Sequence, residues 1–169
     1  DVFGIICESP EDREQIGQYL ESVGRDIDYI SPMVYPSHYA FGQKINGTPY
    51  PKPDLDPYGV VHDTLLRARK RIGAVPEYRA GVRPYLQDFT ASWLGKGHYQ
   101  AYGAEQVRQQ MKAVYEAGYD EWILWNASNH YSEDALLPEG AEQPIPQVIE
   151  ANEPEVDKNT EAMSAEKIR

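Results

Sequence analysis

The chain has 169 residues, which suits one domain and falls short of the roughly 250 residues of a complete eight-fold βα barrel. Its 16 basic and 27 acidic side chains give a net charge of −11, and an acidic surface repels nucleic-acid phosphates and anionic lipid headgroups. We therefore expect no nucleic-acid partner, and no apolar run approaches the about 18 residues that membrane insertion requires. The N-terminal residues lack a signal-peptide pattern, and the single cysteine, Cys7, excludes an internal disulfide.

Aromatic residues make up 11% of the chain, and most of them are tyrosines. A phenol ring combines a flat apolar face with a polar edge, which suits sugar rings and many interfaces. Core packing is an equally good explanation for any single tyrosine.

The first part of the chain predicts a strand, a helix and a second strand. An apolar run at residues 2–6 predicts the first strand. Ser9-Pro10 followed by two acids is typical of a helix start, and Gly24 is the expected end of this helix. The apolar run at residues 29–34 predicts the second strand.

A long loop, a helix and a third strand follow. Residues 36–56 form a loop rich in Gly, Pro and aromatic residues. Asp56-Pro57 repeats the helix-start signal, and helical periodicity continues to Gly73. Residues 80–86 predict the third strand.

The remaining elements repeat the same order. A second aromatic-rich loop spans residues 88–103, a helix runs from about residue 104 to Gly118, and residues 122–125 predict a fourth strand. Helical crossovers join parallel strands, so the β-α-β-α-β-α-β order predicts an α/β protein. The tail, residues 150–169, holds six acids and three bases, and we expect it to be flexible and separate from a folded domain at residues 1–149.

Polar and aromatic residues follow the predicted strands, where α/β proteins place their sites. Alternation along the third strand puts Arg83, Tyr85 and Gln87 on the face opposite the helices, whereas the direction of Asp88 is left open. Polar side chains on this face can also fill the interior of a barrel, so a purely structural role is the alternative to a role in a site. The candidate sugar-binding residues are Tyr35, His38, Tyr39, Arg83, Tyr85, Gln87, Trp125, Asn126 and Asn129.

Glycoside hydrolysis generally needs two carboxyl groups. Asp88 follows the third strand and is one candidate. Most other acids belong elsewhere: Asp28 and Asp120 precede strands, and Asp54 and Asp56 lie beside a helix start. Asp1 is left as a second and weaker candidate, since a first residue can equally be a frayed end.

Other kinds of chemistry find little support in the sequence. The four histidines show no paired spacing typical of a metal site, and we expect neither a metal nor a cofactor. No phosphate-binding glycine loop and no G-x-S-x-G serine motif is present.

Four strings together resemble a known family. They are DVFG from residue 1, DYISPMVYPSHY from residue 28, RPYLQDF from residue 83 and WILWNASN from residue 122. They are similar to a bacterial family of glycoside-hydrolase-like domains with a (β/α)8 barrel, whose substrates are largely undefined. The resemblance spans residues 1 to about 137 and implies a TIM-type fold, a carbohydrate substrate, and a secreted or cell-envelope-associated bacterial protein.

The resemblance also implies which part of the barrel this is. The strings match strands five to eight, so the chain resembles the C-terminal half, with Asp1 at the fifth-strand acid and Asp88 at the seventh-strand acid. The family's fourth strand carries a DYIRFP motif with a plausible catalytic Asp, and no such string occurs here. We therefore expect the chain alone to be inactive and to need a missing N-terminal half or a second copy.

Three functional hypotheses follow. The first is a glycoside-hydrolase-like domain that acts on a polysaccharide through Asp88 and Asp1. The second is a non-catalytic carbohydrate-binding or scaffolding module. The third is a self-sufficient four-stranded flavodoxin-like domain, which the absence of a phosphate loop disfavours.

Overall fold

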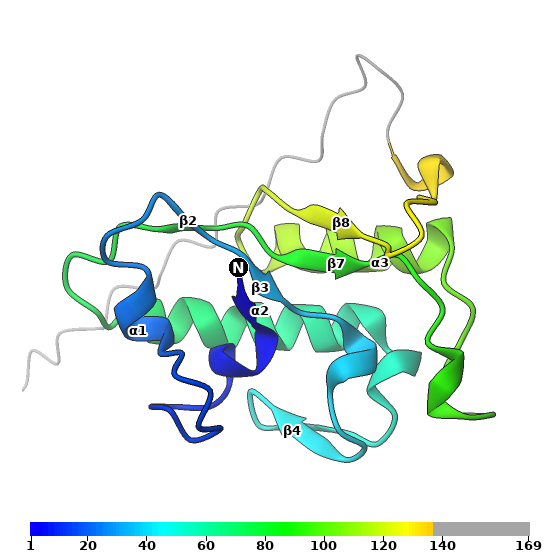
Figure 1. Ribbon diagram of the computed structural model, residues 1–169, viewed down its shortest axis with the longest axis horizontal. Helices are drawn as coiled ribbons and strands as arrows, with labels where there is room; N and C mark the ends of the chain where they lie inside the picture. Colours follow the sequence, from blue (N-terminus) through cyan, green and yellow to red (C-terminus); the bar gives the residue numbers. More distant parts are fainter. Residues whose placement is uncertain (137–169) are drawn as a thin grey trace, which may run out of the picture.

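A computed structural model describes residues 1–136, and its centre is a four-stranded parallel sheet (Figure 1). The strands are β1 (Val2–Phe3), β3 (Pro32–Met33), β7 (Tyr85–Gln87) and β8 (Ile123–Trp125), arranged in the order β1-β3-β7-β8. One level of the sheet contains Phe3, Met33, Tyr85 and Ile123. The strand order follows the chain order without a reversal. This confirms the α/β class and a parallel sheet.

Two of the predicted strands are each interrupted. β2 (Tyr29–Ile30) and β6 (Gly81–Val82) form a separate parallel pair that precedes β3 and β7. Pro32 begins β3 directly after the first break and Pro84 lies in the second, and proline has no N–H to donate to a ladder. The sequence therefore places the strands correctly but divides them at its prolines.

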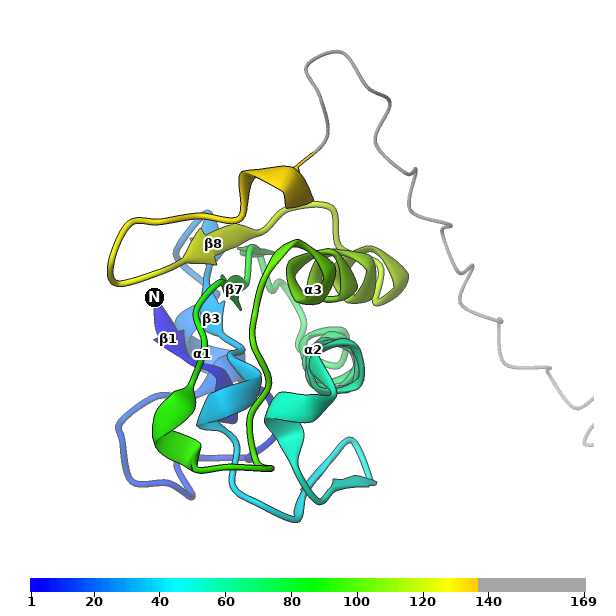
Figure 2. The same cartoon turned by 90° about the vertical axis from the view of Figure 1, so that its right-hand side faces the viewer.

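Two long helices cover one face of the sheet, α2 (Pro57–Ile72) and α3 (Ala104–Glu116) (Figure 2). Both confirm the predicted periodicity, since α2 buries Val61, Leu65 and Ala68 and α3 buries Val107, Met111 and Val114. The Asp56 carboxylate accepts a hydrogen bond from the Gly59 amide at 2.8 Å, as expected of a helix cap. Gly118, with φ of +84°, follows α3 in the left-handed conformation that the sequence predicted.

The first predicted helix is wrong in extent, because only α1 (Leu20–Val23) forms between residues 9 and 24. The Asp12 carboxylate accepts hydrogen bonds from the amides of Ile16 and Gly17, at 2.8 and 2.9 Å. Glu11 and Gln15 have positive φ values. The Asp12 side chain thus gives these amides an alternative to helical partners, and the segment forms turns. The first strand is also shorter than predicted, since a 3-10 turn occupies Gly4–Cys7.

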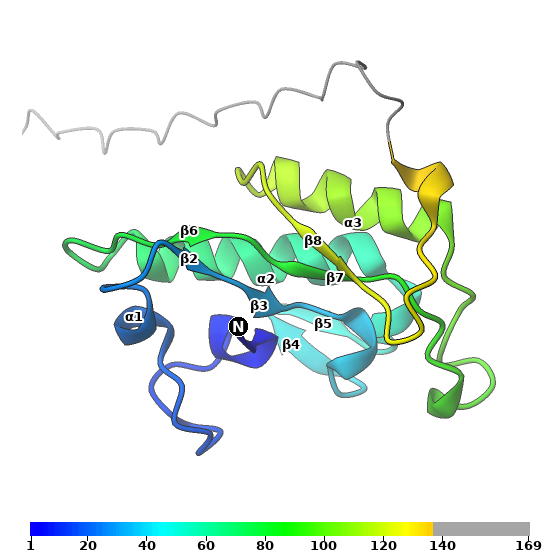
Figure 3. The ribbon, with the colours of Figure 1, turned by 45° about the horizontal axis from the view of Figure 1, so that its top comes forward.

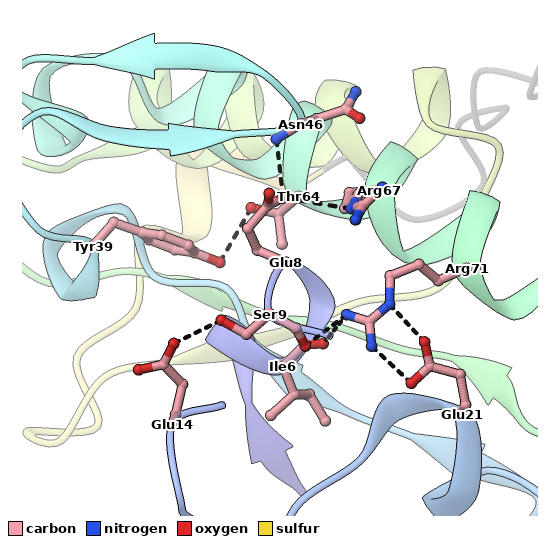
Figure 4. Close-up of polar contacts among 10 residues, drawn as sticks. All are labelled: Ile6, Glu8, Ser9, Glu14, Glu21, Tyr39, Asn46, Thr64, Arg67 and Arg71. Atoms are coloured by element: carbon pink, nitrogen blue, oxygen red, sulfur yellow. Dashed lines mark hydrogen bonds and ion pairs between the residues drawn. The ribbon is translucent and has the colours of Figure 1, made fainter. Parts of the chain in front are cut away.

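Buried Arg71, near the end of α2, bonds to residues of the N-terminal segment between Ile6 and Glu21 (Figure 4). Its Nε and Nη2 donate to the two carboxylate oxygens of Glu21, both at 2.7 Å, and its Nη1 donates to the backbone carbonyls of Ile6 and Ser9. Burial alone would raise the pKa of Glu21, but the hydrogen bonds and charge of Arg71 outweigh burial and lower it below 4.5.

The segment at residues 36–56, expected to be a loop, contains a hairpin. Its strands are β4 (Gln43–Ile45) and β5 (Thr48–Tyr50), and the hairpin lies beside α2 (Figure 3). Asn46 and Gly47 form the turn, with φ values of +50° and +91°, and an Asn-Gly pair is a strong hairpin signal. Ile45 and Tyr50 pack with Tyr39 and Val60 in a small second core.

The predicted tail, residues 150–169, and the end of the predicted domain at residue 149 lie outside the described residues. No helix within residues 1–136 has the length and apolar character needed to cross a membrane.

Candidate functional site

Aromatic side chains gather towards the ends of β3, β7 and β8, at what we call the C-terminal edge of the sheet. Tyr35 follows β3, Trp125 ends β8, and Tyr85 begins β7 and reaches the edge through its contact with Trp125. The ring centroids of Tyr35 and His38 are 5.0 Å apart with perpendicular planes, and those of Tyr85 and Trp125 are 6.4 Å apart. Burial, followed by the neighbouring phenols of Tyr85 and Tyr131, raises the pKa of Tyr35. Burial lowers the pKa of His38. The structure therefore brings together four of the predicted site residues.

Two further aromatic residues extend this edge and were not among the predicted site residues. The Phe89 centroid lies 5.6 Å from that of Tyr35 and 6.3 Å from that of His38. Trp93 stacks on Phe89 at 5.9 Å, with an angle of 21° between the ring planes. The sequence signal was present, since both aromatics follow Asp88 in the same loop.

Asp88 is buried at the end of β7, with 3% of its surface exposed. Its Oδ1 accepts a hydrogen bond from the Ser132 hydroxyl and its Oδ2 accepts one from the Ser132 amide, both at 2.7 Å. Each carboxylate oxygen has a second lone pair, so the group can accept further hydrogen bonds from a ligand. In this structure Asp88 anchors the segment that follows β8.

Asn126 stabilises the same segment, and Asn129 lies on its surface. The Asn126 amide donates to the backbone carbonyls of Asp88 and His130, and its Oδ1 accepts from Ser128. Asn129 is exposed in a left-handed conformation with φ of +56°. The hydrogen bonds of Asn126 thus shape the loop beside Asp88.

Gln87 is fully buried and all of its side-chain atoms have partners within the chain. Its Oε1 accepts from the Ser37 amide at 3.1 Å, and its Nε2 donates to Asp54 at 2.9 Å and to the Phe89 carbonyl at 3.0 Å. The side chain of Gln110 pairs with the Gln87 backbone. Gln87 therefore positions the loops around the edge.

Asp54 belongs to this network, although its position in the sequence indicated only a place beside a helix start. It is 1% exposed, and its Oδ2 accepts from the Gln100 amide at 3.1 Å. Its backbone carbonyl accepts from the Gln100 side chain at 2.8 Å and from the Tyr102 hydroxyl at 3.2 Å. Burial raises the pKa of Asp54, against the opposing effect of these hydrogen bonds. Asp54 thus connects both long loops to β7.

Asp1 and Arg83 belong to the opposite end of the sheet. From the strand register, Asp1 comes two residues before the level of Phe3 and Tyr85, and Asp88 comes three residues after it. Five residues span roughly 16 Å along a strand, beyond the roughly 5 to 9.5 Å between glycosidase carboxyls. The catalytic pairing of Asp1 with Asp88 stays a prediction, and the register does not bring the two carboxylates together.

Arg83 and Tyr39 each have structural partners. Arg83 lies over the Tyr29 ring, 3.9 Å from its centroid, and donates to Glu121 at 2.9 Å. Tyr39 is buried, and its hydroxyl accepts a hydrogen bond from the Thr64 hydroxyl at 3.1 Å. Neither side chain is in contact with the aromatic cluster through the interactions described.

The edge therefore defines a class: an α/β protein with an aromatic-lined site at the carboxyl ends of parallel strands, where such folds bind ligands. Within residues 1–136, no group of three or more His, Cys, Asp or Glu side chains could hold a metal ion. The aromatic faces can stack on flat apolar surfaces, and Asp88 can accept hydrogen bonds from hydroxyl groups.

The sequence matches a family model described as "putative glycosyl hydrolase domain" over residues 1–131. The chain belongs to this family, which confirms the resemblance that the four strings indicated. No curated protein and no solved structure shows significant similarity to the chain.

Proposed function

We propose that the C-terminal edge is the carbohydrate site of a glycoside-hydrolase domain that acts on a polysaccharide, with Asp88 as one of two carboxylates. The observation that carries this proposal is the position of Asp88. It directly follows β7, its backbone amide donates to the Trp125 carbonyl at 3.0 Å, and it precedes Phe89, whose ring contacts Tyr35. Aromatic faces would bind sugar rings, and the Asp88 carboxylate would act on the glycosidic bond that links two bound rings.

We further propose that this sheet is half of a (β/α)8 barrel. Its strand order follows the chain order, and its long helices cover only one face, unlike a doubly wound fold such as flavodoxin. On the opposite face Phe3 is 51% exposed and Trp125 is 45% exposed. Four further strands would cover these side chains and pair with the edges of β1 and β8.

Because the strand register keeps Asp1 far from Asp88 within one chain, the carboxylate that works with Asp88 would come from those further strands. They would belong to an N-terminal half-barrel or to a second copy of the chain, and in either case the active site is complete only in the assembly. We therefore expect the chain alone to bind carbohydrate without ordinary turnover.

A non-catalytic carbohydrate-binding module is the second candidate. The observation that favours it is that Ser132 occupies both oxygens of Asp88 and gives the residue a structural role without catalysis.

The test uses Asp88→Asn and two measurements, the release of reducing ends from polysaccharides and the retention of the protein by them. The hydrolase proposal predicts that Asp88→Asn abolishes the hydrolysis of polysaccharide by the assembly while the variant still binds polysaccharide. Hydrolysis unaffected by Asp88→Asn would exclude a catalytic role for Asp88. Ordinary turnover by a monomer would overturn the need for a partner, and retention by no polysaccharide would overturn the carbohydrate function.

A further inference from the structure

Trp93 is the most exposed large hydrophobic side chain among the described residues, with 65% of its surface accessible. It lies in a 3-10 turn, Ser92–Leu94, beyond the end to which β7 points (Figure 1). Contact with water gives an exposed indole no stabilisation, and together with the neighbouring Phe89 ring it presents an apolar surface that a ligand can cover.

Among the described residues, the indole has one aromatic partner, Phe89. Phe89 stacks on it nearly parallel, 5.9 Å between centroids, and Phe89 in turn contacts Tyr35 and His38. This arrangement fixes the plane of the indole while most of its surface faces solvent. A continuous row of rings therefore leads from the end of the sheet to the outside.

The loop that carries the row is anchored at several points. The Phe89 carbonyl accepts from Gln87, and the Tyr102 amide donates to the Thr90 hydroxyl at 3.0 Å. Ala91, the next residue of the loop, is fully buried. A ligand would meet a preformed surface and would lose little affinity to the ordering of the loop.

The chemistry of this surface favours an uncharged ligand. Residues 89–103 contain no acid and a single lysine, Lys96, while the whole chain carries a net charge of −11. A polyanion would be repelled by the molecule as a whole and would find one cation locally. The faces of neutral pyranose rings, by contrast, are apolar enough to stack on an indole.

We propose that Phe89 and Trp93 form an outer subsite that binds a neutral sugar residue of a long polysaccharide whose next residues reach Tyr35, His38 and Asp88. This inference rests on the proposed carbohydrate function and deepens it. The subsite would make the protein prefer long chains to short ones, because binding at the outer ring adds to binding at the edge.

The experiment is native gel electrophoresis of the full chain in gels that contain hydroxyethyl cellulose, xylan, galactomannan or, as the anionic case, polygalacturonate. We expect at least one neutral polysaccharide to retard the wild type. Trp93→Ala should weaken that interaction about tenfold, and Trp93→Phe should restore most of it. Tyr19→Ala, which removes an exposed ring beside α1, is the matched control and should behave as the wild type.

The outcomes separate this inference from the proposed function. If the wild type is retarded and Trp93→Ala is retarded equally, the outer subsite is wrong and the carbohydrate function stands. If no polysaccharide retards the wild type, both fail. Equal or stronger retardation by polygalacturonate would contradict a neutral ligand. If Trp93→Ala leaves retardation unchanged but changes the sedimentation coefficient of the chain without polysaccharide, Trp93 lies in a protein interface instead.

Discussion

Two buried carboxylates at the C-terminal edge have different partners and therefore different tasks. Asp54 receives amide donors from Gln87 and Gln100 and connects the two long loops. Asp88 receives both donors of one residue, Ser132, and holds the segment after β8. A buried carboxylate that lost these donors would cost several kcal/mol, so both residues stabilise the edge as well as shaping it.

Ser132→Ala tests the structural part of this account. The change removes the hydroxyl that donates to Asp88 at 2.7 Å and keeps the hydrogen bond from the Ser132 backbone amide to Asp88. We expect the free energy of unfolding, measured in urea, to fall by about 1–3 kcal/mol. Ser128→Ala removes an exposed hydroxyl from the same segment and should cost less than about 1 kcal/mol. Equal losses in the two variants would contradict the role assigned to the Asp88 contact.

At the scale of elements, the sequence predicted a helix correctly where a helix-start signal was followed by apolar residues at helical spacing. Asp56-Pro57 and the apolar spacing that follows it predicted α2, and the structure confirms both. The same kind of signal at Ser9-Pro10 failed because the Asp12 carboxylate binds nearby amides and stabilises turns. Strand parity placed Tyr85 and Gln87 on one face, but the partner of Gln87 is Asp54, 33 residues away. Such a contact depends on the packing of loops and has no local signature.

The Arg71–Glu21 pair gives a pH prediction at this scale. The pKa of Glu21 is lowered in the folded state, so its contribution to stability is present above its ordinary pKa of 4.5 and is lost as the pH falls through the folded value. We expect the wild type to lose more stability than Glu21→Gln when the pH is lowered from about 5 towards 3. Urea unfolding at each pH measures the difference, and parallel curves for the two proteins would contradict the prediction.

Arg71→Lys tests the geometry of the same pair. A lysine keeps the charge and loses the fork that contacts Glu21 and two backbone carbonyls at once. We expect a loss of about 1–3 kcal/mol at neutral pH, measured by urea unfolding. Lys70→Arg, on the exposed side of α2, serves as the control and should change stability little. An Arg71→Lys variant as stable as the wild type would show that charge alone suffices.

At the scale of the whole molecule, the open face of the sheet distinguishes this fold from a closed barrel. Aromatic side chains on this face are half exposed, and β1 and β8 are sheet edges. Such a surface favours association with further strands. The order of the sequence motifs predicted four βα units, and the structure agrees on the parallel strands, whereas the closure of the barrel stays a proposal.

Phe3→Glu tests whether this face binds a second copy. If it does, sedimentation velocity of the wild type should show concentration-dependent association, and the variant should abolish it without lowering the melting temperature. Tyr19→Glu places the same charge at an exposed position beside α1 and should leave association unchanged. A wild type that stays monomeric, with β1 amides as protected from hydrogen exchange as those of β3, would contradict the partner proposal.

The three tryptophans offer the most direct test of the carbohydrate edge, because each reports on a different place. Trp93 lies in the outer subsite, Trp125 at the end of β8, and Trp122 is half-buried with its Nε1 donating to the Tyr115 hydroxyl at 3.0 Å. The measurement is the NMR shift of the three indole N–H signals as a neutral oligosaccharide of the retarding polysaccharide is added. The account predicts that the signals of Trp93 and Trp125 move together with one dissociation constant while that of Trp122 stays. A titration that moves only Trp122, or none of the three, would contradict it.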